Sequence, residues 1–306
     1  MSKKIVFMGT PEFSVPTLES LVNSDHQILS VYSQPARKAK RGQKLNSSSV
    51  EIYAKAKSLS IRTPSNLDTD EEYNFLKKIE PDFVIVVAYG KIIPKRFLNL
   101  SKHGFINVHA SLLPKWRGAA PIQRSIMNMD SETGISIMKI VEDLDAGPIL
   151  QQSSIKINEN IDSLTLSKVL SQLGAKLILD VIKKIEKGEA KFREQNHSQK
   201  TYAKKISKEE GQIQWNESAR KILAKINGLN PNPGAWFVHK KQRYKVWKAQ
   251  IKNKNGSVAK ILDNDLTIAC GNQAIKILEI QREGKSRQKT EQFLRGNMIK
   301  KGESIS

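Results

Sequence analysis

The chain has 306 residues, of which 39% are hydrophobic and 26% charged, and it carries a formal net charge of +21. This length suggests about two domains and is ample for a buried core. The longest clean apolar run, residues 83–88, falls far short of the roughly 20 residues that span a membrane. The opening apolar run is too short for a signal peptide, and one cysteine, Cys270, excludes an intrachain disulfide. We therefore expect a cytoplasmic protein that is not bound to a membrane.

The positive charge is unevenly distributed. Residues 1–188 hold 26 Lys and Arg against 19 Asp and Glu, whereas residues 189–306 hold 25 against 11. Five basic residues and no acid lie between Arg37 and Lys44. A lysine-rich surface that only solvates the protein would explain the total, but clustered basic charge favours a polyanionic partner such as nucleic acid. An anionic membrane is the weaker alternative, because no basic amphipathic helix with aromatic anchors stands out.

Apolar runs alternate with helical patterns over the first 188 residues. The predicted strands are residues 5–8, 28–32, 83–88, 105–109, 135–140 and 149–157. The predicted helices are residues 12–22, 50–59, 70–79, 120–129 and 162–187. Strands that alternate with helices indicate βαβ units, so we predict an α/β, Rossmann-like domain with a mostly parallel sheet at 1–188.

The pattern changes after this domain. Residues 189–206 are basic and show no sustained period, so we predict a linker there. A helix follows at 216–229, because Ala219, Ile222, Leu223 and Ile226 recur with helical spacing. Asn216 or Ser218 can cap its start, and Gly228 suits its end.

Short strand-like segments fill the rest of the chain. They lie at 235–239, 243–251, 256–262, 266–270 and 274–281. Five short strands predict a small β-barrel, of the kind found in oligonucleotide-binding (OB) folds. Residues 207–306 are therefore predicted to form a basic, barrel-like second domain that binds RNA.

Three polar residues are candidates for chemistry. Asn107 and His109 share one face of the strand at 105–109, because side chains alternate with period two. They stand at the carboxyl end of that strand, where open α/β sheets bind ligands. Asp145 lies in the loop "EDLDAGPIL", in which Gly147-Pro148 forces a turn. Taken singly, these residues also fit a capped strand end and a solvated turn.

Together, the three side chains suit an acyl transfer. An amide can donate to a developing oxyanion, and an imidazole can relay a proton near neutral pH. A nearby carboxylate would orient that imidazole. No serine or cysteine stands in an activated context, which favours direct transfer without a covalent enzyme intermediate. No zinc-ligand spacing is present, so no metal is expected.

These residues belong to longer stretches that resemble the folate-dependent formyltransferases. The stretches are "VFMGTPEFSVPTLESL", "SQPARKAKRGQKL", "VVAYGKIIP", "INVHASLLPKWRGAAPIQ", "ETGISIMKIVEDLDAGPIL", "TYAKKISKEEGQIQW" and "NPNPGAW". They occur in the family's order over nearly the whole chain. The last two, with the basic C-terminal part, resemble the members that act on methionyl-tRNA.

The resemblance implies a reaction. The α-amino group of methionyl initiator tRNA would take the formyl group of 10-formyltetrahydrofolate, giving N-formylmethionyl-tRNA for translation initiation. Asn107 and protonated His109 would hydrogen-bond the formyl oxygen, and Asp145 would orient His109 and assist proton movement. The enzyme would act as a monomer.

The resemblance also implies binding residues. Ser111, Leu112, Leu113 and Pro114 would form the folate-binding turn. Backbone groups would read the pterin ring in a slot formed by Val87, Tyr89, Val141 and Asp143. A basic loop would wedge against the tRNA acceptor end through Arg37, Lys38, Lys40, Arg41 and Lys44, with Arg41 as its key arginine. Ala36, Lys40 and Asn232 depart from the family's usual residues, all on the tRNA side.

Several alternatives stay open at this point. Leu112 and Leu113 suit an ordinary core equally well, and Trp116-Arg117 suits either a surface stack or a substrate contact. A relative that formylates a small amine, such as glycinamide ribotide or a sugar nucleotide, would use the same three residues. It would not need the basic loop or the basic C-terminal part. A noncatalytic RNA-binding protein on a degenerate transferase fold would not need Asn107, His109 and Asp145.

Overall fold

The computed structural model describes residues 2–39, 44–296 and 299–306, which divide into two compact units. The first unit comprises Met1–Ala119, Thr133–Ile155 and Ser167–Ala203. The second comprises Ala120–Glu132, Lys156–Leu166 and Lys204–Ser306. The units are therefore discontinuous in sequence, and the segments 120–132 and 156–166 lie with the C-terminal part.

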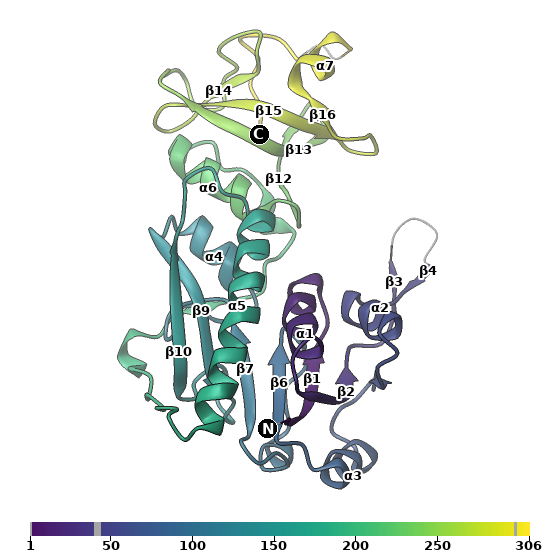
Figure 1. The fold of residues 1–306 in the computed structure, drawn as a ribbon. Coiled ribbons are helices and arrows are strands. Elements are labelled where there is room, and N and C mark those ends of the chain that lie inside the picture. The colour runs from purple at the N-terminus through teal and green to yellow at the C-terminus, as the bar shows by residue number, and fades with distance from the viewer. Residues whose placement is uncertain (1, 40–43, 297–298) are drawn as a thin grey trace. The chain divides into compact units, whose positions relative to one another are not determined.

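A seven-stranded sheet organises the first unit, in the order β10-β9-β7-β6-β1-β2-β5 (Figure 1). The strands are β1 (Lys4–Gly9), β2 (Gln27–Tyr32), β5 (Ile61–Arg62), β6 (Phe83–Val87), β7 (Phe105–His109), β9 (Glu132–Lys139) and β10 (Ile149–Lys156). The pairs from β5 to β7 are parallel, and β7 pairs antiparallel with β9. The prediction of an α/β unit with a mostly parallel sheet is confirmed.

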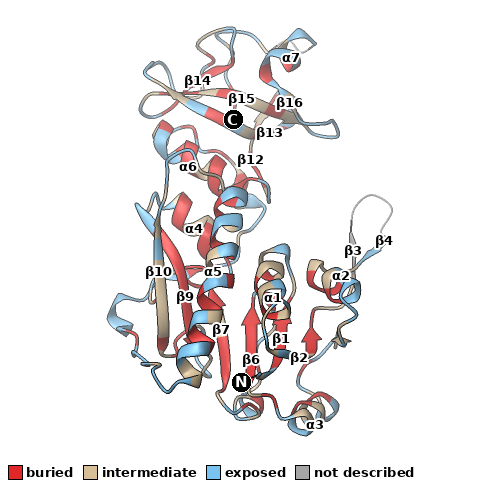
Figure 2. Ribbon diagram, in the orientation of Figure 1, coloured by how far each residue is buried: buried red, intermediate tan, exposed pale blue. Residues whose placement is uncertain are grey.

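Burial explains the sequence pattern of the central strands. Every residue of β6, "FVIVV", is buried, as expected for a strand that is covered on both faces. Figure 2 shows that most of β1 and β7 is also buried, with the exception of the exposed Lys4 and the half-buried Asn107. The sheet therefore provides a rigid support, and the loops that follow its strands can hold side chains at fixed positions.

Helices and short elements complete this part of the chain. They are η1 (Glu12–Ser14), α1 (Val15–Val22), α2 (Ser49–Ala56), α3 (Asp70–Ile79), η2 (Lys95–Phe97), α5 (Ser163–Glu186) and η3 (His197–Gln199). Ser48 and Thr69 cap α2 and α3 by accepting hydrogen bonds from main-chain N–H groups. Two strand pairs that the sequence pattern did not predict also form: the antiparallel β3 (Arg37–Ala39) with β4 (Lys44–Asn46), and the parallel β8 (Arg117–Gly118) with β11 (Tyr202–Ala203).

An antiparallel five-stranded sheet organises the second unit, which confirms a C-terminal antiparallel β domain. Its elements are α4 (Pro121–Met127), η4 (Glu209–Gly211), α6 (Ala219–Leu229), β12 (Ala235–His239), β13 (Gln242–Lys252), β14 (Thr267–Ala269), β15 (Ala274–Arg282), β16 (Gln288–Lys289) and α7 (Thr290–Arg295). The closing of this sheet into an OB-type barrel stays a prediction.

One predicted strand is wrong. Residues 256–262, all of which the structure describes, form only isolated bridges at Lys260 and Ile261. Ala259 adopts the left-handed region, with φ at +64°, and this interrupts an extended chain. The fifth strand is β16, which pairs with β15.

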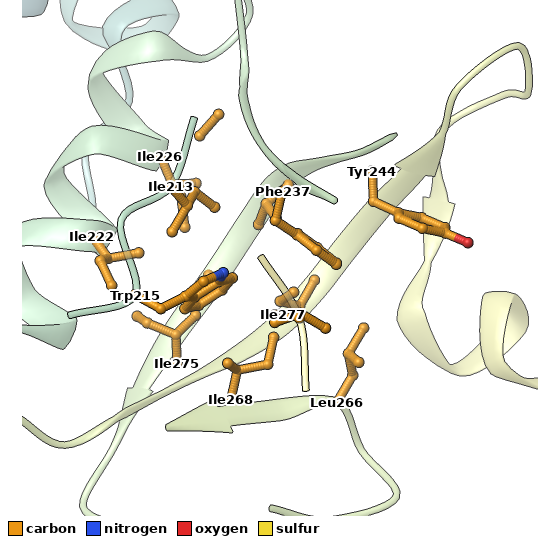
Figure 3. Close-up of a cluster of buried hydrophobic side chains, with 14 of the residues drawn as sticks. Ile213, Trp215, Ile222, Ile226, Phe237, Tyr244, Leu266, Ile268, Ile275 and Ile277 are labelled. Atoms are coloured by element: carbon orange, nitrogen blue, oxygen red, sulfur yellow. The ribbon is translucent and has the colours of Figure 1, made fainter. Parts of the chain in front are cut away.

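The core of the second unit forms where α6 packs on this sheet (Figure 3). The helical spacing of Ala219, Ile222, Leu223 and Ile226 places all four in this core, as predicted. Ser218 caps the helix by accepting from the main-chain N–H of Lys221. Gly228, however, lies inside α6 and does not end it. A Cβ there would stand 2.6 Å from Cγ of Met127, so the glycine lets α4 and α6 approach closely.

Among the helices in the described ranges, none is long and apolar enough to cross a membrane.

Candidate active site

The end of β7 and the loop before β10 bring together the three side chains that the sequence singled out. Nδ2 of Asn107 lies 3.5 Å from Oδ1 of Asp145, and Nδ1 of His109 lies 3.6 Å from Oδ2 of the same carboxylate. His109 is buried, and the side chain of Asp145 is 15% exposed. An amide donor and an imidazole nitrogen thus face one carboxylate from neighbouring positions on a strand end.

The second ring nitrogen of His109 has a partner that sets the tautomer. Nε2 lies 2.9 Å from the carbonyl oxygen of Trp116. Because a carbonyl only accepts, Nε2 carries a hydrogen, and Nδ1 is the nitrogen that can gain or lose a proton. The proton-exchanging side of the ring is therefore the side that faces Asp145.

The loop that carries Asp145 is held on several sides. Asp145 itself lies in the left-handed region with φ at +48°, an uncommon backbone state for a residue other than glycine. The N–H of Gly118 donates to Oδ2 of Asp145 at 2.8 Å. Two residues further on, a Cβ on Gly147 would stand 1.9 Å from the carbonyl oxygen of Lys139, so only glycine fits there.

Arg117 and Gln195 also belong to this neighbourhood, although the sequence did not indicate a role for Gln195. Arg117 is only 3% exposed, and both Nε and Nη2 of its guanidinium donate to Oε1 of Gln195, at 3.1 and 2.7 Å. This buried position does not match a surface stack for Arg117, and a substrate contact stays a prediction. The signal for Gln195 lies in tertiary pairing, which a single sequence does not display.

The predicted folate turn is anchored by its main chain. Oγ of Ser136 donates to the carbonyl of Ser111 at 2.6 Å and accepts from the N–H of Leu113 at 3.0 Å. Nε2 of Gln152 donates to the carbonyl of Leu113 at 2.9 Å. The Leu113 side chain is buried with Met138 and Ile149, whereas Leu112 and Pro114 are half-buried. The core alternative therefore holds for the side chain of Leu113.

The four residues of the predicted pterin slot differ in accessibility. The side chains of Val87 and Tyr89 are buried, Val141 is half-buried and Asp143 is exposed. The carbonyl of Tyr89 already accepts from Oγ1 of Thr10 and Nε2 of Gln34, at 2.8 and 2.9 Å. Because a carbonyl has two lone pairs, that of Tyr89 has no capacity left for a ligand. Burial, with a smaller effect of the Glu72 carboxylate, raises the pKa of Tyr89, so its phenol stays neutral.

The predicted tRNA loop is only partly described. Lys40 and Arg41 lie outside the described residues. Arg37 and Lys38 belong to β3 and Lys44 to β4, which pair antiparallel, with Arg37 opposite Asn46. The basic stretch therefore begins and ends on two adjacent strands of a hairpin.

In the described part of the chain, no group of three or more histidine, cysteine or acidic side chains could hold a metal ion.

Comparison with known proteins extends over both units. The family model described as formyl transferase matches residues 3–182, and that described as formyl transferase, C-terminal domain, matches residues 205–298. A methionyl-tRNA formyltransferase of Pelagibacter ubique is 53% identical over 100% of this chain and 99% of its own. One of Paramagnetospirillum magneticum is 41% identical over 98% of each chain.

Solved structures share the fold at low identity. HypX from Aquifex aeolicus in complex with tetrahydrofolic acid matches 96% of this chain and 47% of its own, with a TM-score of 0.69 and 15% identity. WlaRD, a sugar 3N-formyl transferase, matches 94% of this chain and 100% of its own, with a TM-score of 0.66 and 19% identity.

Proposed function

Because the chain belongs to the methionyl-tRNA formyltransferase family, we propose that it transfers the formyl group of 10-formyltetrahydrofolate to the α-amino group of methionyl initiator tRNA. The observation that carries this proposal is the meeting of Asn107, His109 and Asp145 at the end of β7. The product is N-formylmethionyl-tRNA, and tetrahydrofolate leaves.

Two donors stabilise the transition state. The amine attacks the formyl carbon, a carbon–nitrogen bond forms, and negative charge develops on the formyl oxygen. Nδ2 of Asn107 and the protonated Nδ1 of His109 face Oδ1 and Oδ2 of the Asp145 carboxylate, so both donors lie on the same side of the site, beside that carboxylate. A formyl oxygen that enters there receives two hydrogen bonds that strengthen as its charge grows.

The proton on the attacking nitrogen follows a short route. Asp145 accepts it, and His109 exchanges protons with Asp145 through Nδ1, because Nε2 stays bonded to the carbonyl of Trp116. The bond between the formyl carbon and N10 of the folate then breaks, and the proton passes to that nitrogen. This general acid–base relay requires no covalent bond between enzyme and substrate.

The charge distribution supports a tRNA substrate over a small amine. Residues 189–306 hold 25 basic against 11 acidic side chains, and a polyanion gains affinity from such a surface by counterion release. The basic stretch from Arg37 to Lys44 would contact the acceptor end. The protein would work as a monomer in the cytoplasm, where charged tRNA and reduced folate meet.

The test is a formylation assay with purified full-length protein, 10-formyltetrahydrofolate and charged initiator tRNA. Charged elongator methionyl-tRNA, free methionine and an amino-sugar nucleotide serve as controls. Formylation of the initiator species alone supports the proposal. Formylation of the sugar nucleotide instead would assign a small-amine transferase, and no transfer to any acceptor would favour a noncatalytic protein.

A further inference from the structure

The segment that precedes β11 pairs with the loop that carries Asp145. Arg193 and Ile149 exchange both main-chain hydrogen bonds, at 2.8 and 2.9 Å, as an antiparallel bridge. In an antiparallel register, two residues forward on one chain lie opposite two residues back on the other. This bridge therefore places Gln195 opposite Gly147, two residues after Asp145.

The side-chain amide of Gln195 is buried and uses its full hydrogen-bonding capacity there. Gln195 is 5% exposed. Its Nε2 donates to the carbonyl of Asp145 at 2.9 Å and to the carbonyl of Gly147 at 2.8 Å. Its Oε1 accepts two bonds from the guanidinium of Arg117. Only one orientation of the amide fits these partners, because carbonyls accept and a guanidinium donates.

Arg117 connects this amide to the catalytic side chains. The two neighbours of Arg117 in sequence contact the catalytic side chains directly: the carbonyl of Trp116 accepts from His109, and the N–H of Gly118 donates to Asp145. Arg117, between them, donates to Gln195. The three residues are themselves fixed by the segment after Gln195. The N–H of Trp116 donates to Oγ1 of Thr201, and that of Arg117 to the Thr201 carbonyl, each at 2.9 Å.

We propose that Gln195 is a positioning residue for formyl transfer, which holds the main chain of Asp145 so that its carboxylate faces Nδ1 of His109. This inference rests on the function proposed above. It adds a residue from the segment 183–204, which lies between the two family matches and which neither family model covers. Gln195 touches neither substrate in this scheme. It acts through Asp145.

The physical reason is the strained backbone of Asp145. Its φ of +48° persists only where the surroundings hold it, and the amide of Gln195 binds the carbonyl of this residue. Removal of the donor leaves the carbonyls of Asp145 and Gly147 without that partner. Gly147 is buried, so its loop can regain hydrogen bonds only by moving.

Gln195→Glu separates the hydrogen bonds that the side chain accepts from Arg117 from those that it donates to the loop of Asp145. The carboxylate keeps the shape of the side chain and still accepts from Arg117, but it cannot donate to the carbonyls of Asp145 and Gly147. We expect kcat to fall by about 100-fold, because a displacement of about 1 Å in a reacting group has such an effect. The KM values for folate and for charged tRNA should stay within about threefold of wild type.

A pH profile distinguishes positioning from a structural role. Displacement of the Asp145 carboxylate moves negative charge away from the protonated Nδ1 of His109, so the alkaline limb of the kcat profile should move to lower pH. A loss of folded protein would only scale that profile. The matched control is Gln151→Glu on β10, where Oε1 accepts from the exposed Lys184 at 3.0 Å. We expect the control to keep wild-type kcat and profile.

A second variant keeps the test decisive if a buried glutamate impairs folding. Gln195→Met preserves the length of the side chain without charge or donor, and it should show the same selective loss of kcat. A wild-type kcat in either folded variant, or a change confined to KM, overturns the proposal. Failure of both variants to fold would assign a structural role and also overturns it. If the wild-type enzyme does not formylate methionyl-tRNA, the proposed function fails on its own.

Discussion

The carbonyl oxygen of Trp116 lies 2.9 Å from Nε2 of His109, while Nδ1 of the same ring faces Asp145 at 3.6 Å. The main chain thus fixes one ring nitrogen as a donor and leaves the other for proton exchange. A main-chain carbonyl can fix the tautomer of a histidine as well as a side chain can. Because every residue has such a carbonyl, the sequence does not show which residue accepts from His109. The reactive tautomer therefore depends on how the turn after β7 folds back toward the strand.

Asp145→Asn should reduce turnover by about 10²- to 10³-fold, since it removes the carboxylate that accepts the proton from the attacking amine. The amide keeps the size of the side chain and an oxygen that can accept from the N–H of Gly118. Single-turnover formylation with both substrates saturating measures the effect. Asp180→Asn, on the exposed side of α5, is the control. A near-normal rate in Asp145→Asn would remove Asp145 from the mechanism.

Gly147→Ala should lower both stability and turnover. The new Cβ would stand 1.9 Å from the carbonyl oxygen of Lys139, so the loop that carries Asp145 must move. Overpacking of this kind costs about 1–3 kcal/mol in the free energy of unfolding. Urea denaturation and kcat are the measurements, with Gly296→Ala as control, because a Cβ there meets nothing within 4 Å. Equal stability of the two variants would show that the loop tolerates a side chain.

Asp263 should contribute to stability in a pH-dependent way. Partial burial acts to raise its pKa, but hydrogen bonds from Lys254 and Thr267 outweigh this and lower the pKa from 3.8 to about 2. The folded carboxyl therefore binds its proton less tightly than the unfolded one. Its contribution is complete above about pH 4 and is lost as the pH falls toward about 2.

Asp263→Asn should consequently flatten the loss of stability between these pH values. Urea denaturation at about pH 5 and pH 2.5, followed by tryptophan fluorescence, compares the variant with wild type. Three of the four tryptophans, Trp215, Trp236 and Trp247, lie in the second unit together with Asp263. Parallel acid profiles of the two proteins would contradict the lowered pKa.

Arg41→Ala should weaken the use of tRNA and leave the use of folate unchanged. Loss of one phosphate contact lowers affinity and also reduces the steepness of its salt dependence. We expect the KM for charged tRNA to rise by about tenfold, with the KM for folate close to wild type. Lys187→Ala, directly after α5 and outside the basic loop, is the charge-matched control. A rise in the folate KM alone would mean that the loop is misassigned.

The parts of the fold that could be predicted are those that depend on local sequence patterns, such as apolar runs and helical spacing. The run "FVIVV" is buried at every position, and the helical spacing of Ile222 and Ile226 places both in the second core. By contrast, residues 256–262 have strand-forming composition but bend at Ala259, where φ reaches +64°. Gly228 looks like a helix end, yet it lies within α6 against Met127 of α4. The first error concerns a left-handed backbone at Ala259 and the second a close approach between two helices at Gly228, and residue composition shows neither.

The sequence by itself determined the alternation of strands and helices, the shared face of Asn107 and His109, and the uneven charge, because these follow from side-chain period and composition. Only the tertiary structure decided that Asp145 faces both residues, that the carbonyl of Trp116 sets the tautomer of His109, and that Gln195 binds the loop of Asp145. Those contacts join residues that are 7 to 50 positions apart, and several use main-chain atoms that every residue type carries. No pattern of side chains encodes them directly, since they depend on which strands pair and in which register.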